Sequence, residues 1–125
     1  MLRNRAFTLF VLSLLVMGRA VTAGAADSAA SSYPTWASAV VPLYPHVLPS
    51  SGLLTPKSYG IATTDQFSTV VAWYKSRVHG AWSESEGGNT WSVMSRGLRI
   101  QISLNYYDES AQEKPGTRVA LTRYQ

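Results

Sequence analysis

Residues 80–104 of the chain, GAWSESEGGNTWSVMSRGLRIQISL, decide its fold. Apolar and polar residues alternate in this stretch, and two short turn sequences interrupt the alternation, Gly87-Gly88 and Arg96-Gly97. Alternation with a period of two is typical of strands that bury one face. Each two-residue turn also sets the pairing of its flanking strands, because the loop length of a hairpin fixes its register.

The two turns predict one common register. The first places Glu84 opposite Trp91, and the second places Trp91 opposite Ile102 and Val93 opposite Ile100. One apolar face results, made by Trp82, Trp91, Val93, Leu98, Ile100, Ile102 and Leu104. The other face carries Ser83, Ser85, Thr90, Ser92, Met94, Arg99, Gln101, Ser103 and Asn105. We therefore expect an antiparallel meander with one buried face and one solvated face.

A helix is predicted just before the meander. Asp65 is placed to act as its N-cap, and Gly80 is placed to end it. The apolar residues between them recur with the 3.6-residue period of one helix face. They are Phe67, Val70, Val71, Tyr74 and Val78.

Two further strands are predicted on either side of these elements. Ser58–Thr64 alternates before the helix, and Thr117–Tyr124 follows a polar loop that runs from Asp108 to Gly116. In the last strand we expect Val119 beside Leu104. The predicted core is Trp82, Val93, Ile100, Ile102, Leu104, Leu121, Val70, Val71 and Tyr74.

These elements predict an α+β fold, a two-layer sandwich with one helix packed on a five-stranded, mainly antiparallel sheet. The expected order is β-α-β-β-β-β, with an N-terminal proline-rich arm. We expect a signal peptide at 1–26, a flexible lead-in at 27–32, the arm at 33–57 and the α+β domain at 58–125.

The arm holds five of the six prolines. Because proline lacks the backbone donor and biases its predecessor toward extended backbone, a long helix or a central strand is not expected there. We expect one helical turn at Thr35–Ala39, with Tyr44 and Val47 pointing inward.

The N-terminus has the three parts of a secretory signal peptide. Met1–Arg5 is basic, Ala6–Met17 is apolar, and Val21–Ala26 offers small residues at cleavage spacing. As a helix the apolar part spans only about 18 Å, against roughly 30 Å for the hydrocarbon core of a bilayer. We therefore expect cleavage after an alanine between positions 23 and 26, no stable membrane anchor afterwards, and a periplasmic or secreted protein.

Cleavage would also change the charge. Arg3, Arg5 and Arg19 are three of the eleven basic residues, so eight remain against seven acidic ones. The remaining bases are scattered along the sequence among the acids. A nearly neutral chain creates no long-range field for a polyanion, so no nucleic-acid partner is expected.

Few residues could carry chemistry. The chain has no cysteine and two histidines, which leaves no thiol nucleophile and little for a metal centre. Glu84 and Glu86 lie on one hairpin rather than on two sides of a cleft, as glycoside hydrolysis requires. His79 has a structural place at the helix end, and His46 stands alone between prolines. We expect no catalytic residue, no metal and no cofactor.

Several short segments carry a resemblance. They are Tyr44-Pro45-His46, Thr64-Asp65, Val70-Val71-Ala72-Trp73-Tyr74, Gly80-Ala81-Trp82 and Pro115-Gly116-Thr117-Arg118-Val119-Ala120-Leu121. The chain resembles small exported bacterial domains with a Tyr-Pro segment, a Val-x-x-Phe/Tyr-Tyr helix and a Gly-Trp pair. It departs from them at His46 and Val47, where glycine and alanine are usual. The resemblance implies an exported α+β domain and supplies no catalytic residue.

The aromatic residues give the function hypotheses. Four aromatic residues do not fit the predicted register of inward-facing side chains and are the candidate binding residues: Trp36, Trp73, Tyr107 and Tyr124. The leading hypothesis is a non-enzymatic interaction domain that binds a protein partner in the cell envelope. The alternatives are a module for cell-wall glycan or another carbohydrate, and a small hydrolase. Coplanar exposed aromatics would favour the glycan module, and a pocket joining Glu84, His79 or Asp108 would favour the hydrolase.

Overall fold

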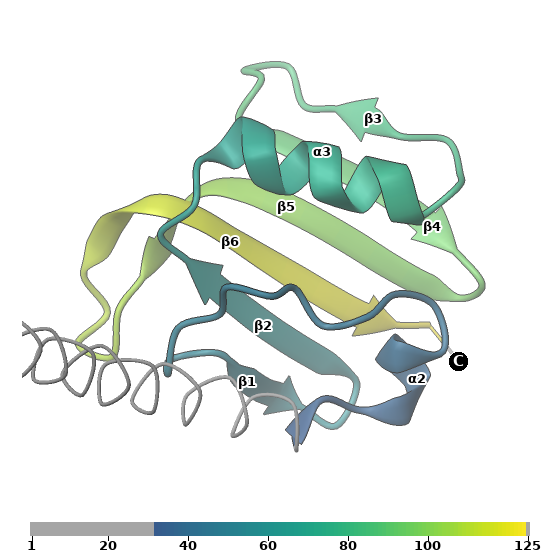
Figure 1. Ribbon diagram of the computed structural model, residues 1–125, viewed down its shortest axis with the longest axis horizontal. Coiled ribbons are helices and arrows are strands. Elements are labelled where there is room, and N and C mark those ends of the chain that lie inside the picture. Colours follow the sequence, from purple (N-terminus) through teal and green to yellow (C-terminus); the bar gives the residue numbers. More distant parts are fainter. Residues whose placement is uncertain (1–31, 125) are drawn as a thin grey trace, which may run out of the picture.

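The computed structural model describes residues 32–124, which fold around one open antiparallel sheet of six strands (Figure 1). Along the chain the elements are α2 (Thr35–Ser38), β1 (Gly52–Thr55), β2 (Ser58–Thr63), α3 (Phe67–Arg77), β3 (Ser83–Glu84), β4 (Thr90–Ser95), β5 (Leu98–Tyr107) and β6 (Glu113–Arg123). The strand order across the sheet is β1-β2-β6-β5-β4-β3. The α+β class is confirmed. The predicted signal peptide lies outside the described residues.

The register of the meander is confirmed. Glu84 pairs with Trp91, Trp91 with Ile102, and Val93 with Ile100. The Arg96-Gly97 turn has φ of 51° and 75° at its two central residues, as a type I′ turn requires.

The turn between β3 and β4 is longer than predicted. The Ser85 amide bonds to the Thr90 carbonyl at 2.8 Å, and the Gly88 amide bonds to the Ser85 carbonyl at 2.9 Å. The loop therefore closes at Ser85, not at the two glycines alone. The register is unchanged because the longer loop is still centred on Gly87-Gly88.

The prediction of five strands is wrong, because the end of the proline-rich arm forms a sixth. In β1, Gly52 pairs with Gly60 and Leu53 with Tyr59, and the ladder shifts between Leu53 and Thr55. The strand is short, irregular and at the edge of the sheet, where the adjacent Pro56 costs no ladder bond. It lies on the outer side of β2, which pairs with β6 on its other side.

The predicted pairing of the last strand is wrong by two residues. Val119 lies opposite Ile102 rather than Leu104, and Leu104 lies opposite Thr117. A shift of two keeps each side chain on its face, so Val119 is still buried. Leu104, however, is 42% exposed, because β5 there reaches a bulge at Asn105 with φ of 68°.

Helix α3 is confirmed, but its predicted cap is wrong. Val70, Val71 and Tyr74 are buried. Gln66 stands at the N-cap position and makes no side-chain cap bond, while the Asp65 carboxylate turns toward the arm. The helix ends at Arg77, with Val78 as its C-cap, before reaching Gly80. Of the remaining predicted core, Trp82 is only partly buried against the core, and Val93, Ile100, Ile102 and Leu121 are buried.

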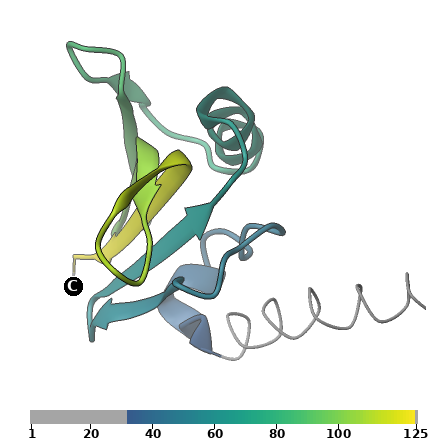
Figure 2. The ribbon, with the colours of Figure 1, turned by 90° about the vertical axis from the view of Figure 1, so that its left-hand side faces the viewer.

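The two helices and the rest of the arm lie on the same face of the sheet (Figure 2). The arm forms the expected helical turn as α2, and Tyr44 of the arm is buried against α3. Its ring stacks on Tyr74 with centroids 6.2 Å apart. Val47 is partly buried. In residues 32–124 no helix is long and apolar enough to cross a membrane.

Candidate functional site

The four candidate aromatic residues lie in three different places. Trp73 is in the middle of α3 and belongs to the packing between helix and arm. Its ring meets those of Tyr44 and Tyr74 edge to face, with centroids 5.1 and 4.8 Å away. The Arg77 guanidinium lies 4.2 Å from the centre of the same ring. Trp73 therefore has a structural role among described neighbours.

Tyr107 and Tyr124 are almost equally exposed, at 50% and 51%. Tyr107 ends β5, pairs with Glu113, and has the Arg118 guanidinium 5.1 Å from its ring centre. Tyr124 follows β6 at the other end of the sheet, where its amide bonds to the Gly97 carbonyl at 2.9 Å. The two exposed rings therefore do not form one surface.

Four bases lie at turns and strand ends toward the Tyr124 end of the sheet, which we call the basic end: Lys57, Arg96, Arg99 and Arg123. The Arg123 amide bonds to the Lys57 carbonyl at 2.8 Å, and Arg123 lies opposite Leu98. Arg99 donates to the Tyr124 hydroxyl at 3.4 Å, on the sheet face opposite to that of the buried Leu98 and Ile100. These bases are scattered along the sequence, and antiparallel pairing brings their turns and strand ends to one end of the sheet.

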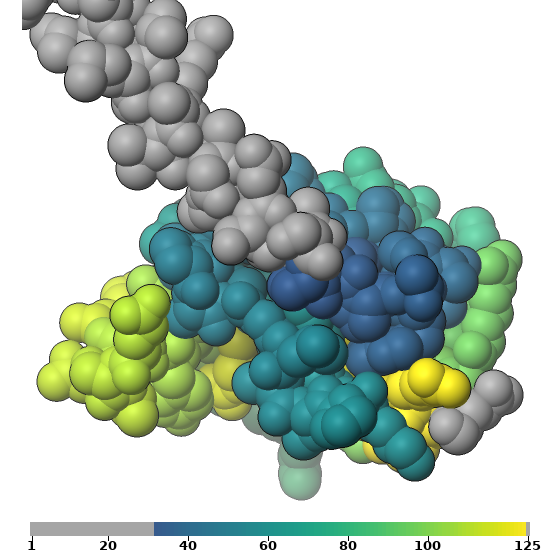
Figure 3. Space-filling model, turned by 90° about the horizontal axis from the view of Figure 1, so that it is seen from below, coloured from purple at the N-terminus to yellow at the C-terminus, as the bar shows by residue number. Residues whose placement is uncertain are grey.

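A pocket of about 440 Å³ opens at the basic end. Trp36 and Val40 of the arm line one side, and Arg96, Leu98 and Arg123 line the other; we call it the Trp36 pocket. From below, the blue arm, the yellow end of β6 and the green β4–β5 turn meet beside one another on the right of the molecule (Figure 3). Ligand pockets of roughly 300–1,000 Å³ are usual in proteins.

Arg96 is held at the rim of this pocket by two features. Its guanidinium donates to the Ala39 carbonyl at 3.1 Å, which ties the β4–β5 turn to the arm. Its backbone has φ of 51°, in the left-handed region. That conformation costs a residue with a side chain roughly 1–2 kcal/mol, and the first position of a type I′ turn favours asparagine, aspartate or glycine.

Acidic residues gather at the opposite end of the sheet. Glu84 and Glu86 lie at the β3–β4 turn, and Asp108, Glu109 and Glu113 lie at the β5–β6 turn. In Figure 1 the β5–β6 turn is at the left and the β3–β4 turn is at the top, left of the centre, whereas the β4–β5 turn and the C-terminus are at the right. Strand β5, which joins the two ends, has ten residues and spans roughly 33 Å. Lys114 and Arg118 also lie toward this end, so acidic residues outnumber basic ones there.

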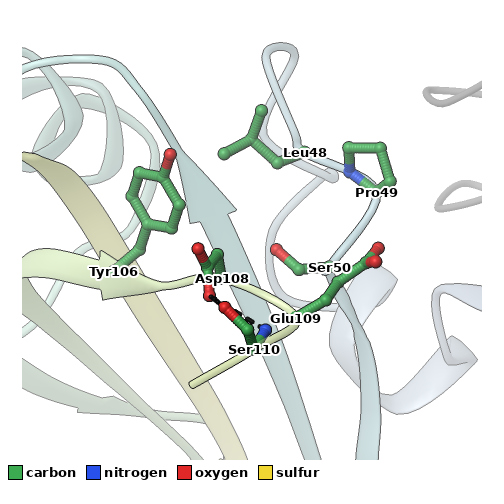
Figure 4. A pocket seen from close by; sticks show the side chains of 7 residues that line it. All are labelled: Leu48, Pro49, Ser50, Tyr106, Asp108, Glu109 and Ser110. Atoms are coloured by element: carbon green, nitrogen blue, oxygen red, sulfur yellow. Dashed lines mark hydrogen bonds between the residues drawn. The ribbon is translucent and has the colours of Figure 1, made fainter. Parts of the chain in front are cut away.

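A second pocket, of about 430 Å³, lies at this acidic end (Figure 4). Leu48 and Ser50 of the arm face Tyr106 and Asp108 across it. Asp108 is already bonded, since it accepts from the Ser110 hydroxyl at 2.7 Å and the Gln112 amide at 3.0 Å. These bonds, that of Ser110 first, hold the pKa of Asp108 below its usual value.

The candidate catalytic residues are not brought together. Neither Glu84 nor His79 lines the pocket of Asp108. His46 lies with Nδ1 2.8 Å from Oδ2 of Asp65, but its side chain is 70% exposed and lines none of the pockets described above. Among residues 32–124 no three histidine, aspartate or glutamate side chains are grouped as a metal site would need.

No protein family matches this chain, and no curated protein or solved structure is significantly similar to it. The candidate binding site therefore rests on the geometry of this chain alone. Sequence reasoning named Trp36 and Tyr124 but missed the arginines beside them. The Arg-Gly turn, with an arginine where asparagine is usual, was the one local signal that could have indicated Arg96.

Proposed function

We propose that this chain is an exported, non-enzymatic domain that binds a protein partner in the periplasm or outside the cell. The observation that carries the proposal is the Trp36 pocket, where a tryptophan shares the lining with Arg96 and Arg123. Tryptophan and arginine are enriched among the residues that dominate binding energy at protein interfaces. The signal-like N-terminus supports export.

The glycan alternative has weaker support. Stacking on a sugar needs exposed aromatic rings on one surface, whereas Tyr107 and Tyr124 lie at opposite ends of the sheet. Trp36 and Trp73 are both partly buried against the core. The hydrolase alternative also has weaker support, because Glu84, His79 and Asp108 share no pocket among those described.

Binding can be tested with a matched pair of positions. A photoreactive phenylalanine analogue replaces Tyr124 at the basic end or Tyr107 at the acidic end, two sites of equal exposure. In the exporting cell we expect a light-dependent adduct of discrete mass from position 124 and none from 107. The change Trp36→Ala should abolish that adduct and weaken the purified complex by roughly 1 kcal/mol or more. Equal adducts from both positions would contradict the proposed site.

Export is tested separately by mass. Protein recovered from the periplasm or the medium should lack its first 23 to 26 residues, given the small residues at those positions. Recovery of the full-length mass from the membrane fraction would contradict export while leaving the binding test intact.

A further inference from the structure

We propose that the Trp36 pocket recognises an acidic segment of the protein partner, with carboxylates on Arg96 and Arg123 and an apolar side chain against Trp36. This inference rests on the proposed function and adds the chemistry of the partner. It commits to a peptide ligand that combines negative charge with an apolar group.

The need for negative charge follows from the arginines. The ion pairs between described residues are those of His46 with Asp65 and of Lys114 with Asp108, and neither uses a base of the basic end. Arg96 is bonded to a neutral carbonyl, which satisfies part of its guanidinium and leaves its charge uncompensated by any described carboxylate. Guanidinium groups pair with carboxylates through two parallel hydrogen bonds, so two arginines at one rim suit closely spaced carboxylates.

The need for an apolar group follows from the other wall. Trp36 and Val40 both line the pocket and are only partly buried against the core, so part of each remains open. A small anion would bind the arginines and leave the apolar wall of Trp36 and Val40 exposed to water. A segment that places an aromatic or aliphatic side chain beside its acids would cover both walls.

The left-handed backbone of Arg96 is a separate reason to infer that its side chain has a binding role. Asparagine or glycine would form the same type I′ turn at lower conformational cost. Costly backbone conformations occur preferentially at functional sites. Of the three described non-glycine residues with positive φ, Arg96, Asn105 and Ala111, Arg96 is the one whose side chain reaches from its turn to the arm and lines the pocket.

The charge separation favours a short acidic segment over a nucleic acid. A nucleic-acid strand needs a continuous basic track for its phosphates, whereas acidic residues outnumber basic ones toward the far end of β5, roughly 33 Å away. The same separation orients an acidic partner during its approach, since the far end repels it.

The test titrates three blocked peptides into the isotope-labelled secreted chain. The first is acetyl-Gly-Asp-Phe-Asp-Gly-amide, the second has asparagine in place of both aspartates, and the third has serine in place of phenylalanine. The readout is the Trp36 indole N–H resonance, assigned by its loss in Trp36→Phe. We expect the first peptide to bind at least about fivefold more tightly than either other, and its affinity to fall as salt rises from about 0.05 to 0.5 M.

Matched variants locate the binding. Arg123→Gln should weaken the first peptide by about fivefold or more, because the side chain supplies charge and makes no hydrogen bond to another described residue. Arg118→Gln is the control, since Arg118 donates to the Asn105 carbonyl at 3.2 Å away from the pocket. Arg96→Gln tests the second guanidinium and is read beside a thermal unfolding curve, because it also removes the bond to Ala39.

Several results would overturn the inference. They are equal affinities for the three peptides, an equal loss in Arg118→Gln, saturation by inorganic phosphate at the peptide's concentration, and tighter binding of a single-stranded DNA of about ten nucleotides. If the adduct from position 124 persists while the acidic peptide shows no preference, the proposed function stands and the acidic chemistry is wrong. If the adduct is also absent, both are wrong.

Discussion

The hydroxyl of Tyr44 lies 2.5 Å from Oδ2 of Asp65 and donates its hydrogen to that carboxylate. Tyr44 belongs to the arm, whereas Asp65 lies between β2 and α3. The backbone of Asp65 is itself fixed, since its carbonyl accepts from the Thr117 hydroxyl at 2.8 Å. The pair therefore fastens the arm to the sheet and helps to place α2, which carries Trp36, beside the arginines.

Removing this hydroxyl should loosen the arm. Tyr44→Phe keeps the buried ring but takes one hydrogen bond from the Asp65 carboxylate, so we expect the free energy of unfolding to fall by about 1–3 kcal/mol. Urea denaturation followed by tryptophan fluorescence measures it. Tyr107→Phe, at a half-exposed residue, should change the value by less than about 0.5 kcal/mol. An equal change in both variants would contradict the role of Tyr44.

The neighbouring Tyr74 should behave in the opposite way. Its hydroxyl is buried and has no hydrogen-bond partner among the described residues, and burial raises its pKa well above the usual value. An unpaired buried hydroxyl costs free energy, so Tyr74→Phe should leave stability unchanged or raise it by up to about 1–3 kcal/mol. A loss comparable to that of Tyr44→Phe would show that the Tyr74 hydroxyl does have a bonding partner.

Acid should weaken the interaction between Tyr44 and the Asp65 carboxylate. The Tyr44 hydroxyl first, and then His46, hold the pKa of Asp65 below its usual value. Since a carboxyl whose pKa is lowered by folding stabilises the fold only when ionised, its contribution is present above about pH 3.9 and is lost as pH falls through the folded pKa.

The measurement compares the native chain with Asp65→Asn. The difference in urea midpoint should be largest at neutral pH and shrink below about pH 4, because protonated aspartate resembles asparagine. Asp108, whose pKa is also lowered, titrates equally in both proteins and cancels. A difference that stays constant down to about pH 2 would show that the ionised carboxylate of Asp65 is not what fastens the arm.

The core can be tested where the two hairpin registers meet. Ile100 is fully buried and pairs with both Val93 and Leu121. Ile100→Ala should lower the free energy of unfolding by about 2–5 kcal/mol, through lost burial and the cavity left behind. Gln101→Ala, one residue along on the uncovered face, is the control and should cost less than about 0.5 kcal/mol. Similar costs at both positions would contradict the assignment of the faces.

The meander could be predicted because its information is local. The turn at Arg96-Gly97 and the alternation beside it fix Val93 opposite Ile100 within a few residues. The sixth strand could not be predicted in the same way. It has four residues next to Pro56, and its pairing depends on β2 as a ready edge. Leu104 was misplaced because the bulge at Asn105 leaves no sequence pattern.

The site was harder to predict than the fold because it is assembled from distant parts. Lys57, Arg96 and Arg123 belong to different turns and strand ends, and only the pairing of β2, β6 and β5 brings them to one end. Counted along the sequence, they looked scattered. Trp36 was predicted as a binding residue because it does not fit the register of inward-facing side chains. The arginines that share its pocket could be recognised only in the three-dimensional fold.

The residues considered for catalysis are Glu84, Glu86 and His79. Glu84 pairs across the β3–β4 hairpin with Trp91, Glu86 is in the exposed turn beyond it, and His79 follows the end of α3. All three are exposed and none lines the Trp36 pocket or the Asp108 pocket. An active site would need them within hydrogen-bond reach of one bound substrate, in a pocket that excludes water. We therefore expect Glu84→Ala, Glu86→Ala and His79→Ala to leave the biological activity, and binding at the basic end, within a few fold of the native chain. Purified protein with a turnover that disappears in Glu84→Ala alone, while its urea midpoint is unchanged, would promote the hydrolase alternative over the binding domain proposed above.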